Sequence, residues 1–388
     1  MKLVKLLFFF AVAVFLMLFA FYAARVDRTY LDIHNSVKSR IESRFSSLPY
    51  EDHFKQAHFY YLRATNRGNF NGVTFLKDGR LMFDDFTGPI FFYDRLNEVL
   101  FLNDYLKEHG TQLLYVRAPN KIKDNSLIPF AFSDNASIAY ADAFIEYLSY
   151  HNVSTLDLRV EMNKDGIDFY SGFFRGDHHW TAETSLWAFG IICEFINREY
   201  GFNLDGMRWD PGSYSIITKE RGMLGEEAET VNAPFLYEDI SFLVPMFHTD
   251  ITVTDIWHLQ YPQFVSRGSY TEVFTPRILE EGRTTFDYSD LNRVHRFFNR
   301  YENTEAREDK NVLLIMDSMG VPLAAHFATV FTIVDNHYLV HKTNHNIWPA
   351  IDMNNYDLVI FLLSDMIISH EDAYPFSEDR LFLDRPWY

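Results

Sequence analysis

Apolar positions along the chain follow two spacings, one typical of amphipathic helices and one typical of buried strands. Helical spacing over residues 90–109, 138–151 and about 182–198 predicts three helices, the first of which stops at a glycine. Compact apolar runs predict strands at 112–116, 153–158, 312–316, 330–334 and 356–362. Because helices and strands take turns along the chain, the pattern predicts an α/β fold.

Other regions do not follow this rhythm. Asn71-Gly72 and Asp78-Gly79 bracket a short apolar run, which indicates a strand that enters a tight turn. The stretch from residue 159 to Gly172 is expected to be irregular. Residues 201–305 combine many aromatic residues with turn signals and short strand-like runs. We interpret 201–305 as an insertion or cap that shapes a substrate groove, and expect most of its aromatic rings in the core rather than in a sugar platform.

The amino end carries a long apolar run. Residues 6–24 contain no charged side chain, and a helix of this length, at about 1.5 Å per residue, approaches the thickness of a bilayer's hydrocarbon core. We interpret residues 1–25 as a cytoplasmic tip with a retained transmembrane anchor, because no clear small-x-small cleavage site follows; a cleaved signal peptide is the alternative. Lys2 and Lys5 favour a cytoplasmic amino end, with a polar stalk at 26–50 and the rest of the chain outside the cytoplasm.

Length and charge limit the possible functions. The 388 residues fit one large domain, so we expect residues 51–388 to form it, with 201–305 as its insertion. The formal net charge of −18 argues against non-specific nucleic-acid binding, which needs a basic surface, and we expect no nucleic-acid partner. Cys193 has no second cysteine for an intramolecular disulfide and is expected to pack as a small apolar residue.

Two distant stretches carry the chemistry. Asp177 and His179 lie in a loop just before the third predicted helix. Ser318 lies between the strand 312–316 and a further helix that starts near Val321. A serine hydroxyl is a poor nucleophile until an imidazole takes its proton and a carboxylate orients that imidazole. We therefore expect the two stretches to meet in space.

Further residues are candidates for the same site. Amide groups converge on a serine between a strand and a helix and can hold the oxyanion of acyl transfer, and Gly320 would let the backbone approach closely. Asn120 and Lys121 follow the strand 112–116, at the sheet edge where ligands gather in open α/β folds, so they could face the site. A simple turn and a surface charge remain the alternative for these two residues.

A competing arrangement is a metal site. His337, His341 and His345 recur at four-residue intervals and would share one face of a helix. Asparagine and threonine residues among them disfavour a regular helix, and no acidic or cysteine ligands accompany them. We therefore expect no metal site here.

The chain resembles the DHHW family and the related alginate-acetylation proteins, which carry an SGNH-hydrolase-like domain. The likeness covers most of residues 50–365 and is most specific at Asp177-His178-His179-Trp180-Thr181. Other matching segments are Asn71-Gly72-Val73, Lys77-Asp78-Gly79, Ala118-Pro119-Asn120-Lys121, Asp157-Leu158-Arg159, Asp317-Ser318 and Tyr356-Asp357-Leu358-Val359-Ile360. The sequence departs from the family at Met319, where an aromatic residue is usual, and at 361–365.

The resemblance implies an SGNH-hydrolase-like parallel sheet flanked by helices. By position it implies Asp177 as orienting acid, His179 as base and Ser318 as nucleophile. It further implies a membrane-anchored, extracytoplasmic O-acetyltransferase or acetylesterase that acts on a cell-surface or exported polysaccharide through an acetyl-serine intermediate, without a cofactor. A polytopic membrane O-acyltransferase would then supply the acetyl group, because acetyl-CoA is not outside the cell. The alternative is a non-catalytic glycan-binding or scaffold component of a polysaccharide modification or export complex.

Overall fold

The computed structural model describes residues 51–65, 68–84, 93–129, 136–256, 261–294, 298–339, 347–353, 355–368 and 373–376. The chain divides into two units, residues 1–58 and 59–388, and the second holds the sheets. No helix within these described ranges is long and apolar enough to cross a membrane. The anchor and stalk expected at 1–50 lie outside the described residues.

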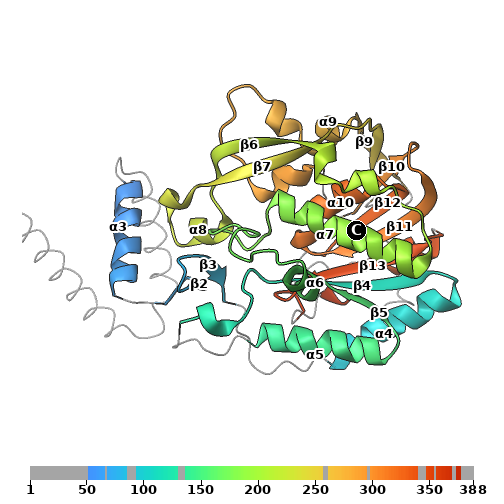
Figure 1. Cartoon of the computed structure of the whole chain (residues 1–388), viewed down its shortest axis with the longest axis horizontal. Coiled ribbons are helices and arrows are strands. Elements are labelled where there is room, and N and C mark those ends of the chain that lie inside the picture. The colour runs from blue at the N-terminus through green and yellow to red at the C-terminus, as the bar shows by residue number, and fades with distance from the viewer. Residues whose placement is uncertain are drawn as a thin grey trace, which may run out of the picture. The chain divides into compact units, whose positions relative to one another are not determined.

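A mixed sheet of eight strands forms the centre of the second unit (Figure 1). Five neighbouring strands run parallel, in the order β5 (Ser154–Asp157), β4 (Gln112–Ala118), β13 (Leu358–Ser364), β11 (Glu308–Met316) and β12 (Phe331–Tyr338). Three antiparallel strands continue it: β10 (Phe298–Asn303), β8 (Ile251–Asp255) and β9 (Gln263–Gly268). The predicted α/β fold is confirmed, but the sheet is only partly parallel.

Helices cover both faces of the parallel strands, which explains why β4, β11 and β13 carry continuous apolar runs. Along β11, Leu314 packs in one core and Leu313 in the other, because successive side chains point to opposite faces. The helices of the first core are α6 (Leu158–Lys164), α7 (Ala182–Tyr200) and α10 (Val321–Phe327). Those of the second are α4 (Tyr93–Glu108), α5 (Ser137–Tyr150) and α11 (Trp348–Met353). Cys193 is free and buried in the first core, as predicted.

The predicted helices are confirmed, and other helices were missed, among them α3 (Glu51–Ala64), α6 and α11. Helix α7 begins after Thr181, whose hydroxyl accepts from the Thr184 amide at 3.3 Å, and it ends at Gly201 in the left-handed conformation (φ 69°). Helix α6 occupies part of the stretch expected to be irregular. Its start is set by Asp157, whose carboxylate accepts the amides at positions 159 and 160, so a capping signal was present in the sequence.

Residues 201–305 divide into two parts. β6 (Tyr214–Met223) and β7 (Glu238–Pro245) pair in a separate two-stranded sheet, with α8 (Glu226–Thr230) between them in sequence. The later strands, β8 to β10, join the central sheet, and α9 (Tyr270–Phe274) follows β9. Phe242, Phe274 and Tyr301 of this segment are each fully buried, in agreement with the expectation that its aromatic rings serve the core.

A small antiparallel sheet precedes the central one in sequence. It contains β1 (Asn69–Phe70), β2 (Val73–Phe75) and β3 (Leu81–Phe83). Asn71 and Gly72, with φ angles of 53° and 77°, turn β1 into β2. Gly79, with φ 91°, lies between β2 and β3. The strand predicted between two tight turns is therefore confirmed.

A buried arginine joins several elements at the carboxyl end of β4. Arg117 has no exposed side-chain surface, and its Nε donates to Asp365 Oδ1 at 2.6 Å. Its Nη1 donates to Asp157 Oδ2 at 3.0 Å and also to Asp142 on α5. Asp365, which follows β13, is equally buried. The guanidinium therefore connects β4, β5, α5 and the segment after β13.

Candidate active site

Asp177 and His179 form a buried hydrogen-bonded pair. His179 Nδ1 lies 2.5 Å from Asp177 Oδ1, and the backbone amide of His179 donates to the same oxygen at 3.0 Å. The second oxygen, Asp177 Oδ2, accepts the amide of Glu226, the first residue of α8, at 2.9 Å. Both carboxylate oxygens are therefore engaged, and the imidazole is held from its Nδ1 side. His179 Nε2 has no hydrogen-bond partner among the described residues.

The loop that carries this pair is fixed on both sides. Phe173 and Trp180 form an isolated antiparallel bridge, and the Phe174 amide donates to the carbonyl of His179 at 3.1 Å. Trp180 is fully buried in the core that contains α7. The bridge and the cap of α7 make the loop a rigid support, which a positioned base requires.

Burial and neighbouring charges set the ionisation of the pair. For Asp177, burial acts to raise the pKa, but the interaction with His179 outweighs it, so the pKa lies well below its usual range. The pKa of His179 falls to about 4, first through burial and then through the charge of His178, against the opposing effect of Asp177. His179 is therefore neutral at physiological pH, the state in which its free Nε2 can accept a proton.

Ser318 lies in the turn between β11 and α10. It begins a short 3-10 turn, Ser318–Gly320, which Asp317 caps by accepting the Met319 amide at 2.9 Å. The other Asp317 oxygen accepts the amide of Ser364 at 2.7 Å, which ties the turn to β13. Ser318 is partly exposed, and Pro322 lies in the first turn of α10, where a proline is well tolerated. The predicted strand, turn and helix around the serine are confirmed.

Tyr288, from a short 3-10 helix at Tyr288–Asn292, connects the two stretches. Its ring stacks on His179, with centroids 3.7 Å apart and planes inclined by 10°. Burial first, and then the charges of Asp177 and Asp317, raise the pKa of its phenol. The same 3-10 helix also contacts the start of α10, where Asn292 Nδ2 donates to the Val321 carbonyl at 2.9 Å. The helix of Tyr288 therefore touches both His179 and the helix that follows Ser318.

Tyr338, at the end of β12, faces the serine. Burial and the charge of Asp317 raise the pKa of Tyr338 to about 12, and a hydrogen bond with the Ser318 hydroxyl acts in the opposite direction. Sequence reasoning identified neither Tyr288 nor Tyr338, since both are single tyrosines without a motif around them. Tyr288 and Tyr338 reach the candidate site only because segments that are distant in sequence pack together in the fold.

The remaining candidates, Asn120, Lys121 and Gly320, are all buried. Asn120 Nδ2 has no hydrogen-bond partner within the described chain, so this donor is available. Lys121 Nζ donates to the carbonyl of Leu81 and lies 3.8 Å from Glu227 Oε1, so Lys121 is not the surface charge considered as its alternative. The Gly320 amide donates to the Asp317 carbonyl at 3.0 Å and is already engaged.

Gly320 has a packing role in its turn. A Cβ atom there would lie 2.5 Å from Met316 Sδ and 2.6 Å from Met316 Cβ. The glycine therefore allows the turn to fold tightly back on the end of β11. The close approach expected at Gly320 is therefore made to Met316. The sequence did not indicate this partner.

The spacing of this cluster is also compatible with a metal ion. Ligand atoms of Asp177, His178 and His179 all lie within 4.8 Å of one another. An ion would have to replace the Asp177–His179 hydrogen bond, so the observed bonding favours acid–base chemistry. Of the three histidines considered for a metal helix, His337 lies in the extended strand β12, and His341 and His345 lie outside the described residues.

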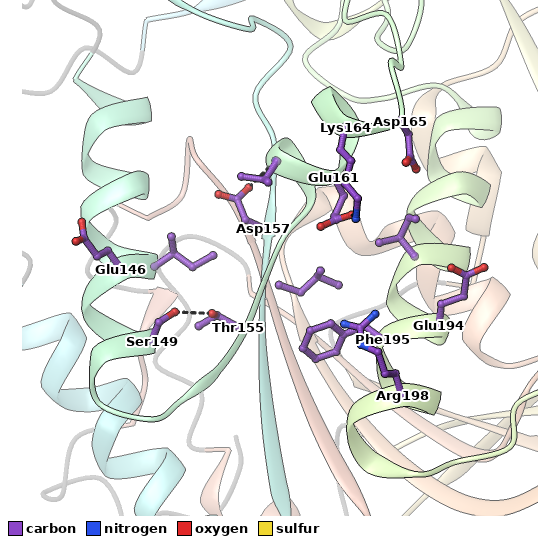
Figure 2. A pocket seen from close by; sticks show the side chains of 14 residues that line it. Glu146, Ser149, Thr155, Asp157, Glu161, Lys164, Asp165, Glu194, Phe195 and Arg198 are labelled. Carbon is purple, nitrogen blue, oxygen red and sulfur yellow. Dashed lines mark hydrogen bonds and ion pairs between the residues drawn. The ribbon is translucent and has the colours of Figure 1, made fainter.

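A separate surface pocket of about 690 Å³ lies between α5, β5, α6 and α7 (Figure 2). Its rim carries charges of both signs, among them Glu146, Lys164 and Arg198, and Ser149 is hydrogen-bonded to Thr155 within it. None of the candidate site residues lines this pocket. Substitutions in this pocket can therefore serve as controls that do not alter the candidate site.

Gly225 holds α8 against the loop of Asp177. A Cβ atom at Gly225 would lie 2.2 Å from the Gly176 carbonyl oxygen and 2.5 Å from Asp177 Cβ. We expect Gly225→Ala to lower the free energy of unfolding by about 1–3 kcal/mol, because backbone has to move to relieve the overlap. Urea unfolding measures this. The matched control is Gly206→Ala, whose new methyl group would meet only Trp209 at ordinary distance; equal stability losses in both variants would contradict the predicted overlap.

Comparisons with known proteins confirm the resemblance. Residues 92–232 match the model of the SGNH hydrolase-like domain of acetyltransferase AlgX, a region that includes Asp177 and His179 but not Ser318. The fold is similar to that of Bacillus cereus PatB1 with a sulfonyl adduct, at 16% identity and a TM-score of 0.60, over 78% of this chain and 99% of that chain. A DHHW family protein from Eubacterium siraeum is similar over 79% of this chain and 95% of that one, with 16% identity and a TM-score of 0.56. No curated protein matches the chain.

Proposed function

We propose that this chain is a serine-dependent O-acetyltransferase or acetylesterase that acts on a cell-surface or exported polysaccharide. The observation that carries the proposal is the buried Asp177–His179 pair, in which His179 is neutral and its Nε2 is unpaired. Supporting it, the partly exposed Ser318 lies just before α10, and α10 contacts the 3-10 helix whose Tyr288 stacks on His179. The match to an acetyltransferase domain model favours acetyl transfer among the reactions of a serine nucleophile.

In the first half of the reaction, His179 Nε2 takes the proton of Ser318 as the serine oxygen attacks the acetyl carbonyl. Asp177 holds the imidazole and stabilises its charged form. Asn120 Nδ2 and the Ser318 amide are the donors we assign to the oxyanion; Gly320 is not, since its amide is bonded to Asp317. His179 then gives the proton to the departing oxygen, which leaves acetyl-serine.

In the second half, His179 removes a proton from the acceptor hydroxyl, which attacks the acetyl-serine. The bond between the acetyl group and Ser318 then breaks, and the serine oxygen takes the proton back from His179. A sugar hydroxyl as acceptor gives a transferase, and water gives an esterase. Lys121 does not take part directly, because it is buried against Leu81 and Glu227. No step uses a cofactor.

The location of the protein in the cell is part of the same proposal. The uncharged run at residues 6–24 supports a membrane anchor with the catalytic domain outside the cytoplasm. An acetyl donor then has to arrive through the membrane, and a polytopic membrane O-acyltransferase is the class of partner that could deliver it. The acceptor would be a polysaccharide, and no nucleic acid is involved.

The proposal predicts a covalent acetyl group on Ser318. We expect full-length protein, incubated with a chromogenic acetyl ester and quenched in acid, to gain the mass of one acetyl group on the peptide that contains Ser318. His179→Gln should not acquire it at a comparable rate, because its serine keeps its proton. Absence of both adduct and turnover in the wild type would favour the non-catalytic scaffold instead.

A further inference from the structure

A second histidine is packed beside the base. The ring of His178 lies 3.8 Å from that of His179, measured between centroids, with planes inclined by 36°. Phe83 of β3 lies near the His178 ring as well, at 5.6 Å. His178 Nδ1 is 3.6 Å from Glu227 Oε2 on α8. His178 is thus held between the base and a carboxylate that sequence reasoning left without a role.

Glu227 is an unusual carboxylate because it is fully buried. Its other oxygen, Oε1, lies 3.8 Å from Lys121 Nζ, which is also fully buried. Neither carboxylate oxygen has a hydrogen-bond partner in the described part of the chain. A buried anion without hydrogen bonds needs compensating cations, and His178 and Lys121 are the two positioned to provide them.

The other charges around His178 have the same sign as Glu227. Glu226 from α8, Asp177 from its own loop and Asp317 from the turn of Ser318 all interact with it electrostatically. Lys121 is the cation beyond Glu227. Burial alone would lower the pKa of His178, but Glu227 and the other carboxylates raise it to about 9.

We propose that His178, kept in its charged form by Glu227, is a positioning residue that keeps its neighbour His179 neutral and able to accept the serine proton. The inference rests on the proposed function of His179 as base. A cation whose ring contacts the base disfavours a second positive charge there, while Asp177 still fixes the orientation of the ring. The pair Glu227–His178 therefore offsets the attraction of Asp177 for a proton on His179.

The inference predicts a shift in the pH profile. In the wild type, the acidic limb of kcat/KM reports the protonation of His179, whose pKa is lowered to about 4. Removing the charge of His178 removes one cause of that lowering, so the pKa of His179 rises. We expect the acidic limb of His178→Gln to move up by about one to two pH units. The alkaline plateau should fall much less than the rate at pH 5.

The test uses full-length protein and two readouts. One is kcat/KM for a chromogenic acetyl ester between pH 4 and pH 9; the other is the imidazole titration of histidine-labelled protein by NMR, which needs no turnover. The matched control is His248→Gln, because His248 also pairs with a glutamate, Glu305 at 2.8 Å, but is exposed. This control should leave both profiles unchanged.

An acidic limb and a His179 titration that stay in place in His178→Gln would overturn the inference. Wild-type protein without turnover would instead contradict the proposed function, and the NMR titration would still decide whether His178 controls His179. If His178→Gln does not fold, Glu227→Gln keeps both histidines. In that variant, we expect the titration of His178 to fall below pH 7, and an unchanged value would equally overturn the inference.

Discussion

We expect Ser318→Ala to lower kcat for acetyl-ester hydrolysis by about 10⁴-fold or more, because Ser318 is the proposed nucleophile. Without its oxygen the two-step path through acetyl-serine is closed, and His179 can only activate water from an unsuitable position. The turn itself should survive, because Asp317 caps it through the Met319 amide and binds the Ser364 amide without using the serine side chain. Initial rates at saturating ester measure the loss.

The control for this prediction is Ser149→Ala. Ser149 lies on α5, in the pocket of Figure 2, where its hydroxyl is 2.7 Å from that of Thr155. It should keep wild-type rates. Ser318→Ala with more than about a tenth of the wild-type rate would exclude Ser318 as nucleophile, since the remaining parts of such sites supply far less.

Arg117→Met is expected to lower the free energy of unfolding by about 3–5 kcal/mol, because the fully buried Asp365 loses the cation that compensates it. Burial already raises the pKa of Asp365, and the charge of Arg117 opposes this effect. Without Arg117 the pKa of Asp365 would rise further, and the carboxylate would take up a proton. Denaturant unfolding at pH 7 measures the loss. The double variant with Asp365→Leu should recover part of it, since no unpaired carboxylate then remains at that position.

A bidentate pair of the same geometry at the surface provides the control. Arg267 donates to both oxygens of Asp250, at 3.1 and 2.6 Å, but its side chain is 61% exposed. Water replaces the lost partner there, so Arg267→Met should leave the free energy of unfolding close to that of the wild type. Equal losses at Arg117 and Arg267 would show that burial of the charge is not the cause.

The parallel core could be predicted because its signals are local. Apolar runs define β4, β11 and β13, and a threonine cap with a following glycine defines α7. The partners of the site could not be predicted in the same way. Tyr288 and Glu227 come from residues 201–305, and their contacts with His179 and His178 depend on pairings between distant segments. Nothing in the residues around them distinguishes them from ordinary core side chains.

The antiparallel strands show the same limit. β8, β9 and β10 are short, and their partly exposed residues give a weaker pattern than the buried apolar runs of β4, β11 and β13. Their position beside β12 is set by backbone pairing between strands, and this pairing cannot be recognised in a single sequence. The free amide of Asn120 had a partial signal, since a polar loop after a strand in an α/β fold predicts a ligand-facing side chain.

The position of β13 has a consequence for how the chain folds during synthesis. β13 follows every other described strand in sequence, yet it lies between β4 and β11. Before residues 358–364 leave the ribosome, β4 and β11 each lack a neighbour and present an unpaired apolar edge, the kind of edge that promotes aggregation. The sheet can close only after translation of β13, so folding is delayed and dominated by long-range contacts. The facing edges of β4 and β11 are therefore covered by the described strand that is made last.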